Sequence, residues 1–292
     1  MGGACGICGS ELSTSWLNRR EWNYRACSTC GAVWLDPLPA DGWAEAYYDR
    51  SYFAGGRQGG YLDYLADEIQ HRVNGQARVA LASRFGASPP GMWLDVGCAA
   101  GFTLVEAHKA GFSVLGVEPS GWARDVARQR FGLKVARTLR EARDEHAGQV
   151  DVVSLFQVLE HLRDPIAALR DARACLRPNG LLILETWDRS SRVARLFGRY
   201  WQQIAPPSVL WLFDRKSIAH SLARTGFRPP EIEPTSKRVN LSWVLGSLAE
   251  KAPRALGTGL RAVGRSGLQR VGITYGLGDL ISVAAMARPD DH

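Results

Sequence analysis

The stretch Trp93-Leu94-Asp95-Val96-Gly97-Cys98-Ala99-Ala100-Gly101-Phe102 decides the fold of this chain. It is an apolar run that ends near an acid, breaks into a turn of small residues and leads into a helical pattern. A strand that is apolar on both faces belongs in the centre of a parallel sheet, with helices packed on either side. The stretch therefore predicts an open α/β sheet whose ligand binds at the carboxyl end of this strand.

The charges around this turn indicate which ligand it suits. A nucleoside-triphosphate loop requires Gly-Lys-Ser/Thr, but Gly101-Phe102-Thr103 stands here without a lysine. A dinucleotide loop directs backbone N–H groups at a pyrophosphate, which the carboxylate of Asp95 would repel. A cationic nucleotide such as S-adenosylmethionine tolerates this acid. Glu118, about twenty residues past the loop, ends the next apolar run and is placed to accept hydrogen bonds from ribose hydroxyls.

These residues resemble the class I S-adenosylmethionine-dependent methyltransferases, whose loop reads acid-x-Gly-x-Gly-x-Gly. Asp95, Gly97 and Gly101 match this pattern, whereas Ala99 replaces the middle glycine. We expect Ala99 to permit close backbone approach if its φ is negative. By itself, the loop fits a tight strand-to-helix turn in another α/β protein equally well.

A second segment strengthens the resemblance. An apolar run over 150–158 is followed by Glu160-His161-Leu162-Arg163-Asp164-Pro165, a helix to Leu176, the turn Arg177-Pro178-Asn179-Gly180 and a strand over 181–185. Asp164 is the expected N-cap of this helix, with Pro165 at its first position. The resemblance covers residues 92 to 188. It implies that S-adenosylmethionine contacts Asp95, Gly97, Ala99, Gly101, Glu118, Pro119, Gln157 and Val158.

The rest of the α/β region follows the same alternation. We expect helices over 103–110 and 122–131, strands over 113–117 and 134–136, and a helix over 215–225 capped by Asp214. Strands near 228–233 and 280–287 are expected to form the antiparallel pair that closes a Rossmann-like, doubly wound sheet. The methyltransferase domain is thus predicted over 91–292. A helical insertion at about 235–278, with helices over 241–250 and 255–271, is expected to cover the substrate and permits peripheral membrane contact.

Four of the six cysteines form two pairs, Cys5-x2-Cys8 and Cys27-x2-Cys30, each followed by a glycine. This spacing suits one tetrahedral zinc ion bound by four thiolates. Iron and two disulfides are the alternative uses. We predict a small zinc ribbon over 1–40 that stabilises the fold, the rival role being nucleic-acid recognition.

Residues 41–90 are predicted to be a helical linker and lid. A short helix is expected from Trp43 to Tyr48, and a longer one from Tyr61 to Phe85. Tyr47, Tyr48, Tyr52, Phe53 and Tyr61 form an aromatic cluster. These rings either contact the cofactor or acceptor, or pack the ribbon against the sheet.

Composition bounds the class of protein. The chain has 292 residues, 46% of them hydrophobic, and a formal net charge of +7. Only five of its 36 basic residues are lysines, and the arginines are scattered, so a nucleic-acid partner is not expected. There is no apolar run long enough to span a membrane and no leader-like segment, so we expect a cytoplasmic enzyme.

The expected chemistry follows from the place of His161 and Glu160, just past the fourth strand. Methyl transfer from a sulfonium gains mainly from orientation, plus a base when the acceptor carries a proton. We therefore predict transfer to a hydroxyl of a small biosynthetic intermediate, with His161 as base and Glu160 orienting it or binding the acceptor. The alternatives are a sugar C-methyltransferase, a ribosomal RNA methyltransferase and a non-catalytic cofactor-binding scaffold; His161 in a purely structural role also remains open.

Overall fold

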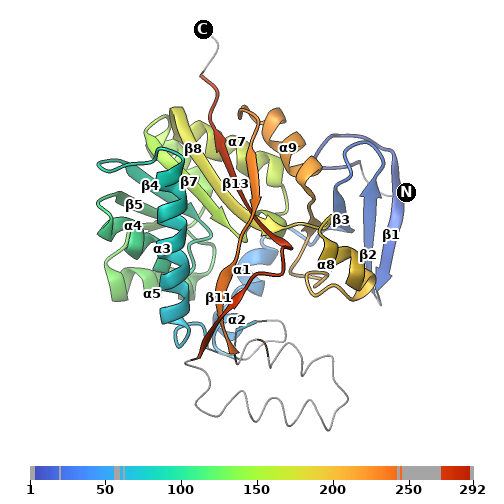
Figure 1. The fold of residues 1–292 in the computed structure, drawn as a ribbon, viewed down its shortest axis with the longest axis horizontal. Helices are drawn as coiled ribbons and strands as arrows, with labels where there is room; N and C mark the ends of the chain where they lie inside the picture. The colour runs from blue at the N-terminus through green and yellow to red at the C-terminus, as the bar shows by residue number, and fades with distance from the viewer. Residues whose placement is uncertain are drawn as a thin grey trace.

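The computed structural model describes residues 4–19, 21–55, 60–61, 63–241, 244 and 271–289. Their strands form a seven-stranded sheet, a four-stranded sheet and a two-stranded sheet. Figure 1 shows the large sheet at the centre of the molecule, with the N-terminal strands beside α8 and α9 at one edge. No helix in these ranges is long and apolar enough to cross a membrane.

The seven-stranded sheet confirms the Rossmann-like prediction. Its order is β10-β13-β8-β7-β4-β5-β6, with β4 to β8 all parallel. The parallel strands are β4 (Met92–Val96), β5 (Ser113–Val117), β6 (Val135–Ala136), β7 (Val150–Phe156) and β8 (Leu176–Trp187). Because the order reverses between β5 and β7 on either side of β4, the carboxyl end of β4 lies at the switch point where such sheets bind ligands.

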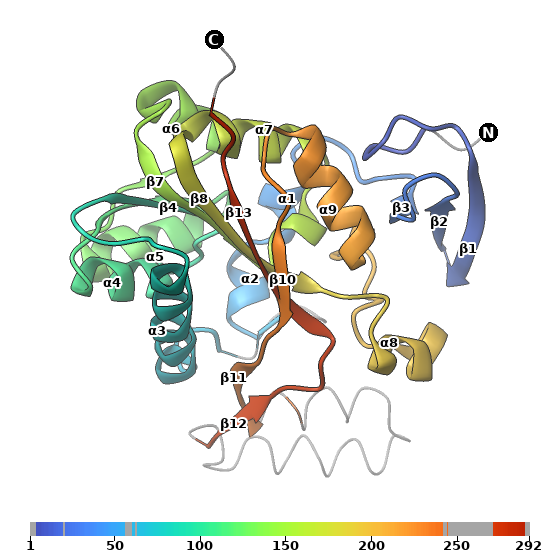
Figure 2. The same cartoon turned by 45° about the horizontal axis from the view of Figure 1, so that its top comes forward.

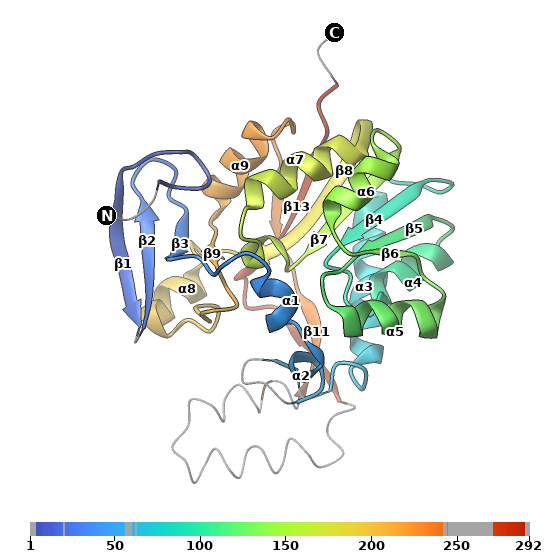
Figure 3. The same ribbon diagram turned by 180° about the vertical axis from the view of Figure 1, so that it is seen from behind.

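Helices cover both faces, as the apolar β4 requires. Trp93 packs with α3 (Glu68–Arg84), α4 (Phe102–Lys109) and α5 (Gly121–Phe131). Leu94, the next residue, packs on the other face with α6 (Leu139–His146), α7 (Pro165–Cys175) and α9 (Arg215–Arg224). The helix α3 lies over one face of the sheet in Figure 1 and α7 over the opposite face in Figure 3. The predicted caps Asp164 and Asp214 each accept a backbone N–H at their helix start.

The sheet closes with the expected antiparallel pair. β10 (Glu231–Pro234) pairs with β13 (Leu280–Met286), and β13 pairs antiparallel with β8. Between them, the predicted insertion is not helical at its ends. There β11 (Lys237–Asn240) and β12 (Gly272–Tyr275) form an antiparallel pair that extends beyond the large sheet in Figure 2. The two expected helices lie almost wholly outside the described residues.

The N-terminal strands form a ribbon that shares the main core. β1 (Ser13–Arg19), β2 (Trp22–Cys27) and β3 (Val33–Asp36) pair antiparallel, and β9 (Trp211–Leu212), which follows the large sheet's β8 in the chain, adds the fourth strand. The Tyr24 hydroxyl donates to the carbonyl of Val209 at 2.7 Å. The ribbon is therefore built into the main α/β domain through both backbone pairing and apolar packing.

The linker is helical but broken differently from the prediction. α1 (Trp43–Tyr47) and α2 (Arg50–Phe53) are short, and α3 begins at Glu68 rather than near Tyr61. The reason is Asp63, whose side chain accepts the N–H groups of Leu65 and Ala66 and so holds a turn there.

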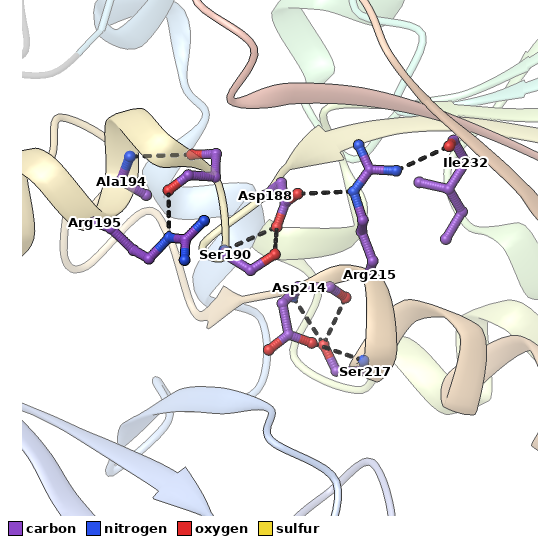
Figure 4. Close-up of polar contacts among 9 residues, drawn as sticks. Asp188, Ser190, Ala194, Arg195, Asp214, Arg215, Ser217 and Ile232 are labelled. Atoms are coloured by element: carbon purple, nitrogen blue, oxygen red, sulfur yellow. Dashed lines mark hydrogen bonds and ion pairs between the residues drawn. The ribbon is translucent and has the colours of Figure 1, made fainter.

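The segment after β8 is anchored by a compact polar network (Figure 4). Asp188 accepts from the N–H and hydroxyl of Ser190 at 2.8 and 2.5 Å, and from Arg215 Nε at 3.1 Å. Arg215 also donates to the carbonyl of Ile232 on β10. This network fixes the chain just past Trp187 and leads into α8 (Arg192–Phe197) and the 3-10 turn Gly198–Tyr200.

Candidate active site

The turn after β4 has the tight geometry that its small residues predict. Gly97 and Gly101 have φ values of 71° and 83°, in the left-handed region that favours glycine. A Cβ on Gly97 would lie 2.5 Å from Cγ2 of Val158, and a Cβ on Gly101 would lie 2.3 Å from Cδ1 of Leu133. Both positions therefore exclude a side chain for reasons of backbone conformation and of space.

Ala99 differs from the prediction because its φ is +47°, not negative. A left-handed alanine costs about 1–2 kcal/mol because its Cβ crowds the following carbonyl. The conformation directs the Ala99 N–H to Oε2 of Glu118 at 2.9 Å. The hydrogen bond to this buried carboxylate offsets part of the strain.

Glu118 lies at the end of β5, across from the loop. Its carboxylate accepts the N–H of Ser120 at 2.8 Å in addition to that of Ala99. Burial raises the pKa of Glu118, while these two hydrogen bonds act in the opposite direction. Each oxygen of an ionised carboxylate can accept a further hydrogen bond, so the pair of oxygens is suited to vicinal hydroxyls.

Asp95 is buried at 4% exposure and accepts the hydroxyl of Ser154 at 2.6 Å. Ser154 in turn accepts Nε1–H of Trp93 at 2.8 Å, so this chain of hydrogen bonds crosses from β4 to β7. Burial raises the pKa of Asp95 to about 7, although Ser154 and the charge of Arg78 lower it. The site thus holds a carboxyl that a cationic ligand would favour in its ionised form.

A cavity of about 1120 Å³ opens at this edge of the sheet. It brings together eight of the predicted site residues: Asp95, Gly97, Ala99, Glu118, Pro119, Gln157, Val158 and His161. Two predicted residues are not on its wall. Gly101 lies behind the loop against Leu133 as the N-cap of α4, and the Glu160 side chain is buried against Thr186.

His161 lies on the cavity wall in the turn Leu159–His161. Its Nδ1 is 2.5 Å from the carbonyl oxygen of Ser208, which can only accept a hydrogen bond. This contact places the proton of a neutral imidazole on Nδ1 and leaves Nε2 as an acceptor. The ring of Tyr48 meets His161 edge-on at 6.2 Å between centroids.

Glu160 is almost fully buried at 2% exposure, and burial raises its pKa. Oε2 accepts the hydroxyl of Thr186 at 3.0 Å, whereas Oε1 has no hydrogen-bond partner among the described residues. Its backbone carbonyl accepts the N–H of Leu210 at 2.8 Å. The Glu160 side chain is therefore buried beneath the turn Leu159–His161 and is not part of the cavity surface.

Three further residues line the cavity outside the loop and the Glu-His turn, and of these only Tyr48 belongs to the aromatic cluster expected from the sequence. Arg78 of α3 pairs with Glu185 at 2.6 Å and donates to Thr103 at 3.2 Å. Tyr48 has a buried hydroxyl without a hydrogen-bond partner among the described residues. Lys237 of β11 also lines the cavity. These residues lie outside the sequence motifs. The helical spacing of α3 was the only sequence signal for Arg78, the tyrosine cluster was the only one for Tyr48, and Lys237 had none.

The four ribbon cysteines converge as predicted. Their Sγ atoms all lie within 4.8 Å of one another, with Cys5 to Cys30 at 3.7 Å and Cys8 to Cys27 at 3.4 Å. Tetrahedral zinc with four Zn–S bonds of about 2.3 Å requires sulfur separations of about 3.8 Å. All four thiols are free, and three of them are buried. The donor set and its spacing therefore fit a zinc ion.

Comparison with known proteins identifies the class. A family model described as methyltransferase domain matches residues 67–231, more than half of the chain. The chain therefore belongs to this family, and its class is that of the S-adenosylmethionine-dependent methyltransferases.

Two curated relatives are both named ubiquinone biosynthesis O-methyltransferase. The protein from Actinobacillus pleuropneumoniae is 31% identical over an alignment of 140 residues that covers 44% of this chain and 55% of the relative. The protein from Bordetella avium is 29% identical over an alignment of 169 residues that covers 51% of this chain and 69% of the relative. The match thus spans between about half and two thirds of these relatives.

The solved structures that resemble the chain confirm the fold. The crystal structure of a SAM dependent methyltransferase from Archaeoglobus fulgidus aligns with a TM-score of 0.52 at 16% identity. The alignment covers 76% of this chain and 98% of that one.

Proposed function

We propose that the chain transfers a methyl group from S-adenosylmethionine to a hydroxyl of a small biosynthetic intermediate, with His161 as the general base. The observation that carries this proposal is the hydrogen bond of His161 Nδ1 to the Ser208 carbonyl. It fixes the tautomer whose Nε2 can accept the hydroxyl proton as the oxygen attacks the methyl carbon. The two curated relatives, which are named O-methyltransferases, support a hydroxyl acceptor.

The cofactor is assigned to the loop end of the cavity. Glu118 would accept both ribose hydroxyls, and Asp95 would offset the cationic methionine portion of the ligand. The backbone at Gly97 and Ala99 allows close approach of the cofactor, Pro119 and Val158 border its adenine side, and Gln157 contacts it toward the acceptor end. S-adenosylmethionine then supplies the activated methyl group, and this chain's residues orient it and the acceptor.

We also propose that Cys5, Cys8, Cys27 and Cys30 hold one structural zinc ion. The support is the sulfur geometry and the place of the ribbon, whose strands pair with β9 and pack into the main core. Metal binding would order the N-terminal segment because a module of this size has little core of its own.

A cofactor-consumption screen across phenols, sugars, polyketides, quinones and RNA tests the reaction. With an acceptor in hand, His161→Ala should lower turnover by roughly a hundredfold or more and leave S-adenosylhomocysteine affinity intact. His161→Asn separates the two roles of this side chain, because its amide N–H can still donate to the Ser208 carbonyl but cannot act as a base. His146→Ala, on α6 and away from the cavity, serves as the control.

Activity of His161→Asn near that of the unmodified enzyme would refute the base. A preference for RNA would refute the substrate class, and failure to consume cofactor with every acceptor while binding it tightly would favour a non-catalytic scaffold.

A further inference from the structure

The cavity has a cationic side chain that the proposed reaction does not yet use. Lys237 belongs to β11, whose segment lies between the two strands that close the sheet. Its Nζ donates to Oε1 of Gln157 at 2.6 Å and lies 4.8 Å from the ring centroid of Trp187. All three side chains line the cavity. Lys237 is therefore held at the carboxyl ends of β7 and β8, at the same edge of the sheet as His161.

Burial outweighs the favourable charges around Lys237. Burial lowers the pKa of Lys237 to about 8, and the charge of Arg78 acts in the same direction. Glu185, Glu160 and Asp279 raise the pKa, but less than burial lowers it. An anion bound in the cavity would restore part of the stabilisation that the ammonium group loses on leaving water.

The distribution of charge along the cavity separates two ends. At the loop end, Asp95 and Glu118 favour the cationic and hydroxyl groups of the cofactor. Farther along the described wall, the neutral side chains of Tyr48, Trp187 and Val209 line the cavity together with the ammonium of Lys237. Arg78 also lines the cavity, but its guanidinium is paired with Glu185 at 2.6 Å. This second end combines aromatic borders with the ammonium of Lys237, which suits a planar ring that bears an anionic substituent.

We propose that Lys237 binds a carboxylate on a planar, hydroxyl-bearing acceptor and so sets the specificity of the site. This inference rests on the proposed function, because it assigns the His161 end of the cavity to the acceptor. The ammonium group anchors the carboxylate, and the ring then extends toward His161 with its hydroxyl. Gln157 fixes the Lys237 side chain in that position through the 2.6 Å hydrogen bond.

Binding of 3,4-dihydroxybenzoate and of catechol, its neutral counterpart, tests the proposal. Calorimetry is performed on the full chain saturated with S-adenosylhomocysteine. We expect the carboxylate ligand to bind at least about tenfold more tightly than catechol, the gain of one charge-assisted hydrogen bond. Lys237→Met should remove this preference, Lys237→Arg should retain most of it, and the exposed Lys216→Met should leave it unchanged.

Three outcomes would overturn the proposal. They are an unmodified protein that binds both ligands equally, a Lys237→Met variant that keeps the preference, and a Lys237→Met variant that loses S-adenosylhomocysteine affinity instead. Circular dichroism and S-adenosylhomocysteine binding verify that each variant is folded, and the comparison of the two ligands on the unmodified protein needs no variant.

If the preference is present but no hydroxyl acceptor is methylated, the proposed function fails and the anion site stands. If neutral acceptors are methylated without any such preference, the proposed function stands and the anion site fails.

Discussion

The buried carboxyl of Asp95 should weaken the fold at neutral pH, and Asp95→Asn should strengthen it. The carboxyl of Asp95 has a pKa of about 7 in the folded chain and an ordinary value of 3.8. Between these values the folded state binds more protons than the unfolded state, so the free energy of unfolding falls as the pH rises. A difference of about three pKa units corresponds to about 4 kcal/mol, reached in full above pH 7. Asparagine keeps an acceptor for Ser154 and removes this penalty.

The measurement is urea unfolding of the two proteins without ligand at several pH values. The stability advantage of Asp95→Asn should grow by about 2–3 kcal/mol between pH 5 and pH 8. The exposed Asp125→Asn should stay within about 0.5 kcal/mol of the unmodified protein at every pH. An advantage that is constant with pH, or that shrinks as the pH rises, would refute the reasoning. The same variant should bind S-adenosylhomocysteine more weakly, since it loses the charge that faces the cofactor.

Three further changes test the loop, the ribose site and the ribbon. Glu118→Ala should weaken S-adenosylhomocysteine binding by about tenfold to a hundredfold through loss of charge-assisted hydrogen bonds; calorimetry showing unchanged affinity would contradict the assignment. Cys8→Ser should lower zinc content and thermal stability together, and elemental analysis that finds no zinc in the freshly purified unmodified protein would remove the basis for the site. Ala99→Gly should raise the free energy of unfolding by about 0.5–1 kcal/mol by relieving the left-handed alanine; a loss of stability in denaturant titration would mean that the strain is absent.

The sequence predicted the α/β core well because its signals are local. The double-sided apolar pattern of Trp93–Val96 required a central strand, and the caps Asp164 and Asp214 marked helix starts that the structure confirms. It was less successful where a single side chain redirected the backbone. Asp63 delays α3, and the hydrogen bond from Ala99 to Glu118 accompanies a left-handed alanine. Periodicity and propensity contain no signal for such individual hydrogen bonds.

By itself the sequence determined the class of fold, the loop with its two acids and the four-cysteine set, because spacing along the chain fixes which backbone turns and ligand sets can form. Only the tertiary structure decided which side chains meet in the cavity. In the folded chain the Glu160 carboxylate accepts a hydrogen bond from Thr186, and His161 contacts the carbonyl of Ser208. Lys237 of β11 donates to Gln157 at the end of β7. These contacts join residues 26 to 80 positions apart. Their formation depends on how sheets and helices pack together, and no local pattern in the chain records that packing.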